Sequence, residues 1–158
     1  MILLSLAEFY WSVALKMTST ENSVKRIESK ADIETYIAQL NYSLSKRTSR
    51  LYFQEDRQVD LYRNERYTNR YTMDDLFPNM DPVKALKREL KKLTVSDYIE
   101  TIKDIHYPNR SELRVFGKKY TDNVYIKIRV EMTPNEMIFV MSFHYAEFPF
   151  TPSTFPYK

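Results

Sequence analysis

Residues able to move protons and to hold phosphate stand in two neighbouring apolar segments. His144 ends the run MIFVMSFH, while Tyr125 and Lys127 alternate with apolar residues in NVYIKIRVE. An imidazole can serve as a base or acid near neutral pH, and a cation placed beforehand stabilises charge building on a phosphate. Such a set could cut RNA without a metal ion: a base frees the 2′-oxygen to attack phosphorus, and an acid protonates the departing 5′-oxygen. We assign catalysis to His144, Lys127 and Tyr125.

The alternation of these segments decides which side chains share a face. Residues 123–131 alternate apolar and polar side chains with a period of two, which predicts a strand. The residues TPN at 133–135 predict a turn, and residues 137–144 predict a central strand that is apolar on both faces. Three apolar side chains of the second strand are then expected in the core: Phe139, Met141 and Phe143. Polar side chains of both strands are expected together on the other face: Tyr125, Lys127, Arg129, Ser142 and His144.

The preceding segment, ELRVFGKK at 112–119, predicts another strand beside this pair. We expect Val115 to face the core, and Arg114 and Phe116 to lie on the polar face. Cations of this strand and its neighbour are the residues assigned to substrate binding: Arg114, Lys118, Lys119 and Arg129. The alternative for His144 is a structural role, as a partly buried strand histidine bonded to the backbone.

Composition excludes several classes of protein. The 158 residues favour one domain with a real core. One glycine, Gly117, is too few for the glycine-rich loops that bind nucleotide phosphates. With no cysteine and two histidines, the sequence predicts no metal site and no cofactor. Lack of cysteine fits a reducing, cytoplasmic compartment, and a net charge of +3 is too small to indicate nucleic-acid binding by itself.

Three helices are predicted ahead of these strands. Residues 29–47 carry an apolar stripe after a serine that can cap the first turn. Residues 81–93 begin with Asp-Pro, which is typical of a helix start, and residues 94–105 begin with a Thr and an Asp spaced to cap one another. A short strand at 51–54 and a helix or irregular turn at 56–67 complete this half. The first helix is expected to pack on the sheet.

Arginine and tyrosine interleave through residues 47–71, and the pattern allows two interpretations. Arginine binds phosphate with a planar fork and tyrosine stacks on unpaired bases, so the segment could contact a nucleic acid. The alternative is a solvated surface whose rings cover the core.

The two ends of the chain stand outside this framework. Residues 1–15 are apolar, but the segment is too short to span a membrane. Met17 is as good a candidate for the natural start of the protein as Met1. We therefore treat 1–28 as an N-terminal extension, the alternative being a short helix packed on the domain, and 29–158 as the domain. Prolines after His144 forbid a central strand there, so the tail is expected to cross the sheet as an extended aromatic segment.

Three stretches in order resemble the MqsR-type toxins (motility quorum-sensing regulator family), within the RelE-like toxin–antitoxin ribonucleases. They are LTVSDYIETI, RVFGKKYTDNVYIKIRV, and VMSFHYAEFPF running to a terminal FPYK, and the likeness covers residues 29–158. The resemblance implies an α+β fold with N-terminal helices packed on one face of an antiparallel sheet. It also implies a cytoplasmic type II toxin acting as a metal-independent endoribonuclease on mRNA, on or off the ribosome. A cognate antitoxin would be its partner and its only link to DNA.

The family's residues carry over in part. Its VYxK tyrosine and lysine match Tyr125 and Lys127, and its SDxY segment matches residues 96–98. The lysine expected just after that segment is Glu100 here, and a C-terminal lysine after the SF pair is His144. These departures concern the catalytic set, not the fold. A second class of function stays open: a non-catalytic module that binds RNA, the ribosome or a protein, for example a phage-derived inhibitor.

Overall fold

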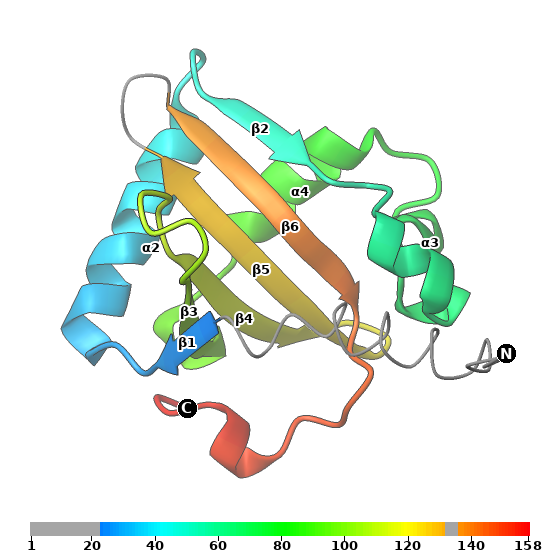
Figure 1. The fold of residues 1–158 in the computed structure, drawn as a ribbon. Helices are drawn as coiled ribbons and strands as arrows, with labels where there is room; N and C mark the ends of the chain where they lie inside the picture. Colours follow the sequence, from blue (N-terminus) through cyan, green and yellow to red (C-terminus); the bar gives the residue numbers. More distant parts are fainter. Residues whose placement is uncertain (1–22, 132–135) are drawn as a thin grey trace, which may run out of the picture.

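A sheet of six strands organises residues 23–131 and 136–158, which the structure describes (Figure 1). The structure is a computed structural model. Its strands are β1 (Ser23–Arg26), β2 (Arg50–Phe53), β3 (Tyr98–Asp104), β4 (Leu113–Lys119), β5 (Asn123–Glu131) and β6 (Met137–Tyr145). They lie in the order β1-β3-β4-β5-β6-β2, and every neighbouring pair is antiparallel except the parallel pair β6 and β2. The expectations for residues 1–16 and for the turn at 133–135 lie outside the described residues.

Three α-helices occur in the described residues: α2 (Lys30–Ser45), α3 (Asn69–Leu76) and α4 (Pro82–Leu90). Short 3-10 turns fill several connections: η2 (Gln58–Tyr62), η3 (Glu65–Tyr67), η4 (Val95–Asp97) and η5 (Pro152–Thr154). α2 and α4 confirm two of the predicted helices. Their capping side chains accept from backbone N–H groups as expected, Ser29 from Asp32 at 3.1 Å and Asp81 from Lys84 at 3.0 Å.

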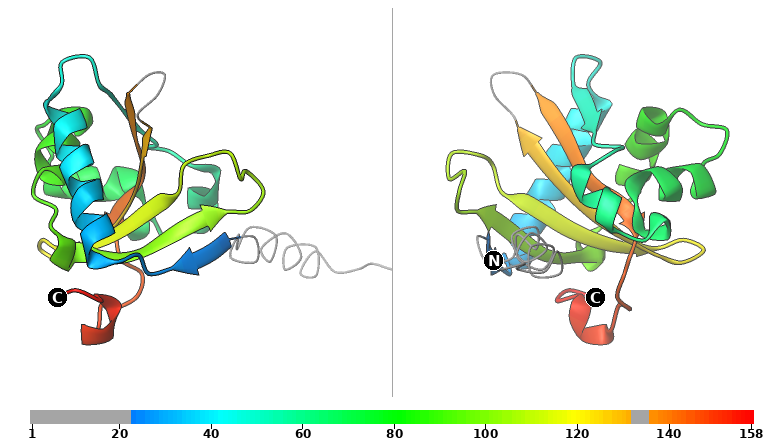
Figure 2. Two further views of the ribbon diagram at one scale, coloured as in Figure 1. Left: turned by 90° about the vertical axis from the view of Figure 1, so that its left-hand side faces the viewer. Right: turned by 45° about the vertical axis from the view of Figure 1, so that its right-hand side comes forward.

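The main core lies between the sheet and the helices α2 and α4, which cover one face of it (Figures 1 and 2). β5 buries every second residue, and α2 buries one stripe, because these are the periods of a strand and a helix. Fully buried members of this core are Ile33, Leu40, Leu86, Leu90, Phe116, Ile128 and Phe143. The predicted α+β fold is therefore confirmed, whereas the sheet predicted to be antiparallel is only mostly so, because β2 and β6 run parallel. The opposite face, which carries Tyr125 and Lys127, is called the open face below.

The helix predicted at 94–105 is wrong: the segment forms one 3-10 turn, η4, and then strand β3. The expected cap does form, since the carboxylate of Asp97 accepts from the backbone N–H of Thr94 at 2.9 Å. It closes only that turn. The following residues include the β-branched Ile99, Thr101 and Ile102, which favour a strand. β3 then gains backbone pairing on both sides, from β1 and β4.

The faces predicted for β4 are inverted. Phe116 is opposite Ile126 and lies in the main core, whereas Val115 is opposite Lys127 and lies on the open face. Val115 helps to form a small second cluster with Ile102 and Leu113. Pairing with β5 sets this register, and alternation within β4 alone does not reveal it, because both of its faces carry apolar residues.

A β-bulge corrects part of the prediction for β6. Phe143 and His144 lie as expected, in the core and on the open face, opposite Ile126 and Tyr125 respectively. The register shifts between Lys127 and Ile128, so that Val140 rather than Met141 pairs with Ile128. An extra residue moves the earlier part of the strand to the other parity. The prediction that Phe139 and Met141 join the main core is therefore wrong; Met141 packs on the second cluster instead.

The sequence analysis placed the boundary between an N-terminal extension and the domain at residues 28/29, and residues on both sides of it belong to one folded unit. β1 pairs with β3, and the Glu28 side chain is only 7% exposed. At the other end, the tail after β6 is fixed at two points. The Tyr157 hydroxyl donates to the backbone oxygen of Glu28, and the Phe150 ring fills the space over Gly117, where a Cβ atom would lie 2.7 Å from it.

Candidate functional site

A pocket of about 510 Å³ opens on the open face of the sheet. Its floor is β5 and β6, one wall comes from β1 and β3, and the segment 57–63 and the tail after β6 form the rest. Four cations, two carboxylates and four further polar side chains line it: Lys25, Arg57, Arg63, Lys127, Glu100, Glu147, Tyr125, Ser142, His144 and Thr154. The structure thus brings the three residues assigned to catalysis into one pocket.

Strand pairing places these three residues. Tyr125 lies directly opposite His144, and Lys127 lies opposite Ser142. The rings of Tyr125 and His144 stack at 5.5 Å with an interplanar angle of 24°. The Lys127 ammonium group stands 5.6 Å from the centre of the Tyr125 ring. Glu100 belongs to the same cross-strand row, because β3 pairs Glu100 with Val115 and β4 pairs Val115 with Lys127.

Helix α3, which the sequence analysis did not predict, holds the strand that carries His144. β2 pairs only with the first part of β6, so the backbone beyond residue 140 would lack partners on that edge. The Asn69 side chain donates to the oxygen of Met141 at 2.9 Å and accepts from the N–H of Phe143 at 3.0 Å. The Thr72 hydroxyl accepts from the N–H of Tyr145 at 2.9 Å. Polar side chains of a helix thus replace a strand along this edge.

His144 is held as one neutral tautomer. It is 6% exposed, and its Nδ1 donates to the backbone oxygen of Tyr145 at 2.8 Å, because a carbonyl can only accept. Nε2 therefore carries the lone pair of the neutral ring, and it accepts from Nη1 of Arg63 at 3.4 Å. Burial and the nearby charges of Arg63, Arg57 and Lys127 lower the pKa of His144 to about 3. The histidine is both packed in the strand and exposed to the pocket through one nitrogen.

This lowered pKa predicts a stability that falls in mild acid. In the unfolded chain the imidazole takes a proton near pH ~6.5, whereas in the folded protein its pKa is about 3. The contribution is therefore complete above that unfolded pKa and is lost as the pH falls toward the folded one. Between pH ~7.5 and ~5, wild type should lose about 2 kcal/mol more of its free energy of unfolding than His144→Gln, measured by urea denaturation.

The exposed His106 offers the control for that measurement. His106→Gln keeps His144 in place and should retain the wild-type dependence on pH. A wild-type curve that runs parallel to that of His144→Gln would show that the buried imidazole does not resist protonation.

Lys127 is a partly buried cation without a carboxylate ion-pair partner in the described residues. Burial, together with the charges of Arg57 and Lys25, lowers its pKa to about 8, although Glu100 opposes the shift. The ammonium form still predominates at neutral pH, but it gives up its proton more readily than an ordinary lysine. Burial, and next to it the charge of Glu100, raises the pKa of Tyr125, so its phenol stays protonated.

Two arginines that the sequence analysis did not assign to the site form its upper wall. The Arg57 side chain, 10% exposed, donates to the Ser142 hydroxyl at 3.2 Å and to Asp60 at 3.3 Å, while its buried Nε has no hydrogen-bond partner. Arg63 pairs with Glu147 at 2.9 Å and lies 3.8 Å from Asp60. Both arginines belong to the Arg/Tyr-rich segment 47–71. That pattern was the available signal, but it did not show which arginines turn toward the sheet.

Arg114, assigned to substrate binding, does not reach the pocket. It lies on the helix-covered face, donates to both carboxylate oxygens of Glu28 at 2.9 and 3.0 Å, and stacks 4.5 Å from the centre of the Tyr36 ring. The prediction that it shares a face with Lys127 is wrong, because the register of β4 is inverted relative to the expected one. β1 brings in the neighbouring Glu28, which gives this arginine a structural partner.

The other three residues assigned to substrate binding also lie outside the pocket lining. Lys118 and Lys119 line a separate hollow beside the tail, and Lys118 pairs with Asp97 at 3.4 Å. Arg129 shares the open face with Lys127, but it stacks over Phe139 at 5.0 Å and pairs with Glu131 at 3.2 Å.

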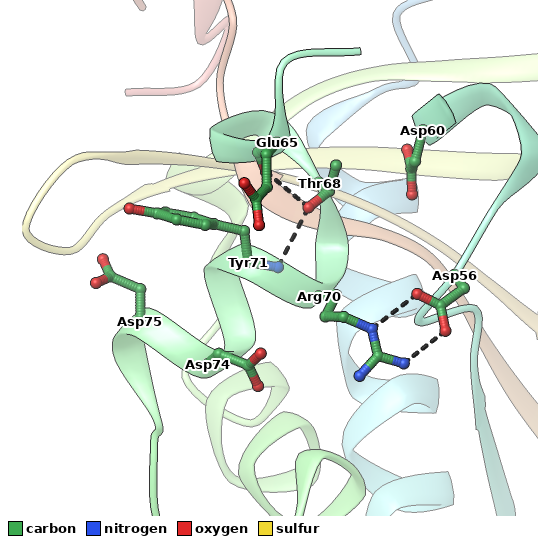
Figure 3. A pocket seen from close by; sticks show the side chains of 8 residues that line it. All are labelled: Asp56, Asp60, Glu65, Thr68, Arg70, Tyr71, Asp74 and Asp75. Carbon is green, nitrogen blue, oxygen red and sulfur yellow. Dashed lines mark hydrogen bonds and ion pairs between the residues drawn. The ribbon is translucent and has the colours of Figure 1, made fainter. Parts of the chain in front are cut away.

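A separate acidic hollow of about 360 Å³ is lined by residues between Asp56 and Asp75 (Figure 3). Its carboxylates come from Asp56, Asp60, Glu65, Asp74 and Asp75. Asp56 accepts from Arg70 at 2.8 Å, and Asp75 accepts from the Tyr145 hydroxyl at 2.5 Å. Across the described ranges, no group of three or more His, Cys, Asp or Glu side chains is arranged to hold a metal ion. The clear contribution of this hollow to the site is Asp60, which holds Arg57 and Arg63.

Comparisons of this chain with protein-family models, with curated proteins and with solved structures find no match. Among the described residues, no helix has the length and apolar character needed to cross a membrane.

Proposed function

We propose that the open-face pocket cuts RNA by metal-independent phosphoryl transfer, which makes the protein an endoribonuclease toxin similar to the MqsR family. One observation carries the proposal. A partly buried lysine, two arginines and a neutral imidazole whose lone pair faces Arg63 converge on one pocket, and the cations exceed the carboxylates there. Cleavage of a phosphodiester without a metal ion requires a base, an acid and cations that stabilise the charge on the phosphate.

An anion would complete the charge balance of the pocket. Lys127 lacks a carboxylate partner in the described part of the chain, and Nε of Arg57 lacks a hydrogen-bond acceptor. A buried donor without an acceptor is unfavourable, and a guanidinium group fits the oxygens of phosphate. We assign the phosphate to Arg57, Arg63 and Lys127, with the Ser142 hydroxyl beside it.

The same anion would activate His144. Burial and, next to it, nearby cations hold down the pKa of its imidazole, so a bound phosphate that offsets the charge of those cations would raise that pKa. If Arg63 turns from Nε2 to the phosphate, the lone pair becomes available. His144 Nε2 then accepts the 2′-hydroxyl proton while the 2′-oxygen bonds to phosphorus. Stacking on Tyr125 and the bond to the Tyr145 carbonyl hold the ring in place.

Lys127 supplies the second proton. Its ammonium group, with a pKa of about 8, protonates the 5′-oxygen as the bond between that oxygen and phosphorus breaks. The products are a 2′,3′-cyclic phosphate and a free 5′-hydroxyl; the proton taken by His144 then returns to solvent, and Lys127 takes one up from solvent. The rate should fall as the pH rises through the pKa of Lys127.

The family resemblance supports the same assignment at the level of segments. The SDY segment leads into β3, which places Glu100 on the pocket; VYIK is the part of β5 that carries Tyr125 and Lys127; and SFH is the part of β6 that carries His144. All three resembling stretches therefore converge on one site. A RelE/MqsR-like arrangement, a cytoplasmic location and an antitoxin partner that covers the pocket belong to the same proposal.

The test is direct cleavage of RNA. Purified protein should convert a single-stranded oligoribonucleotide to fragments ending in 2′,3′-cyclic phosphate in the presence of EDTA, detected by mass spectrometry. An oligonucleotide of the same sequence without 2′-hydroxyls should bind without being cut. Intact RNA after long incubation, with and without ribosomes, would contradict the proposal.

A non-catalytic RNA-binding module is the second candidate, and one observation favours it. Nε2 of His144 is already occupied by Arg63, and its pKa of about 3 makes the resting imidazole a weak base. On this alternative the pocket holds a phosphate of RNA and leaves it intact. Binding of both oligonucleotides without cleavage of either would select it.

A further inference from the structure

An aromatic ring stands exposed at the rim of the pocket. Phe148 lines the pocket and is nevertheless 78% exposed, although it belongs to a tail whose other phenylalanines are partly buried. Burying a phenylalanine side chain stabilises a folded protein, and this ring is left almost without such burial. A large apolar ring beside a cationic pocket is where a ligand with a flat face and a negative charge would bind.

The backbone on both sides of Phe148 is anchored. Before it, Glu147 pairs with Arg63 at 2.9 Å, and after it Pro149 restricts the chain to extended conformations. Phe150 then packs over Gly117 and contacts Phe155 edge to face at 5.4 Å. The tail thus holds the Phe148 ring at the rim while leaving it uncovered, and no loop has to be ordered when a ligand arrives.

We infer that Phe148 is a stacking platform for an unpaired nucleobase of RNA next to the phosphate held by Arg57 and Arg63. The inference rests on the proposed function for the position of that phosphate. Arg63 links the phosphate site to the segment that carries Phe148, because one of its nitrogens faces His144 and another pairs with Glu147. A base in a duplex is stacked between its neighbours and cannot cover the ring. The substrate class is therefore single-stranded RNA.

The test uses an oligonucleotide that is not cut. A short single strand without 2′-hydroxyls, carrying 2-aminopurine, reports stacking as loss of fluorescence and binding as a titration curve. Stacking of one base on an aromatic side chain is worth about 1–3 kcal/mol, so Phe148→Ala should weaken binding about 5- to 150-fold and should restore the fluorescence. Phe148→Trp should bind at least as well as wild type.

Two controls separate this inference from the proposed function. Leu61→Ala removes another exposed apolar side chain, 79% exposed and outside the pocket lining, and should leave binding unchanged. The same sequence as a duplex should bind weakly and should not respond to Phe148→Ala. Binding of the single strand by Phe148→Ala within twofold of wild type, or no binding by wild type, would overturn the inference. Loss of binding in Phe148→Ala together with intact RNA would overturn only the cleavage.

Discussion

Lys127→Met is expected to abolish RNA cleavage and at the same time to make the protein more stable. Losing the group that protonates the leaving oxygen costs ~10²–10⁴ in rate. Burial and neighbouring cations lower the pKa of this lysine from 10.5 to about 8. Each pKa unit corresponds to about 1.4 kcal/mol, so keeping the ammonium form in the folded protein costs about 3 kcal/mol at neutral pH. Methionine has a similar shape and no charge, and we expect its free energy of unfolding to rise by about 1–3 kcal/mol.

Two further variants test the assignment. Lys127→Arg keeps the charge and should keep some activity. His144→Ala removes the base and should also lower the rate ~10²–10⁴-fold, and it should lower the melting temperature as well, because the imidazole is buried and stacked on Tyr125. Cleavage by Lys127→Met at the wild-type rate would remove Lys127 from the mechanism. A less stable Lys127→Met protein would show that the ammonium group has a partner in the folded state.

The opposite signs expected for activity and stability follow from how the site is built. Arg57, Arg63 and Lys127 stand around a buried imidazole, and burial together with the nearby cationic charges lowers the pKa values of Lys127 and His144. Charges positioned in advance to stabilise a transition state destabilise the folded protein when no substrate is bound. Asp60 and Glu147 offset part of the cationic charge by pairing with the arginines, whereas Lys127 forms no ion pair with a carboxylate in the described residues and has only Glu100 to oppose its pKa shift.

The part of the site that lies on paired strands could be predicted from the sequence. Alternation along β5, with the polar positions at the end of β6, placed Tyr125, Lys127 and His144 on one face, because a strand has only two faces to choose between. The two arginines could not be placed in the same way. Arg57 and Arg63 come from a connection of 3-10 turns without a period, and only the packing of that segment against β6 turns them inward.

The wrong predictions about the fold have the same origin, since each feature depends on a partner far along the chain. Residues 98–104 carry apolar residues that also fit a helix, and pairing with β1 and β4 makes them a strand. Arg114 was assigned to the polar face because it is charged, but the carboxylate that holds it is Glu28, 86 residues earlier. The bulge in β6 has no mark in the sequence, because Val140 and Met141 are both apolar.

Aspartate substitutions at Phe143 and Phe139 should differ sharply, and the difference tests this bulge. Phe143 is fully buried in the main core, so Phe143→Asp buries an unpaired charge and should cost about 4–5 kcal/mol or more. That approaches the whole stability of an ordinary domain, ~5–15 kcal/mol, so we expect loss of the cooperative unfolding transition.

Phe139 has the same parity along β6, but the bulge places it on the open face, stacked on Tyr52 at 5.5 Å and under the guanidinium group of Arg129 at 5.0 Å. Phe139→Asp loses these ring contacts and keeps a partner for the arginine, so its cost should be about 1–2 kcal/mol. Circular dichroism with urea denaturation compares the two variants. A regular strand would make both substitutions equally destructive, because residues two apart would then face the same core. A folded Phe139→Asp protein beside an unfolded Phe143→Asp protein therefore requires the extra residue between them. That residue leaves His144 on the open face opposite Tyr125 while Val140 points into the core.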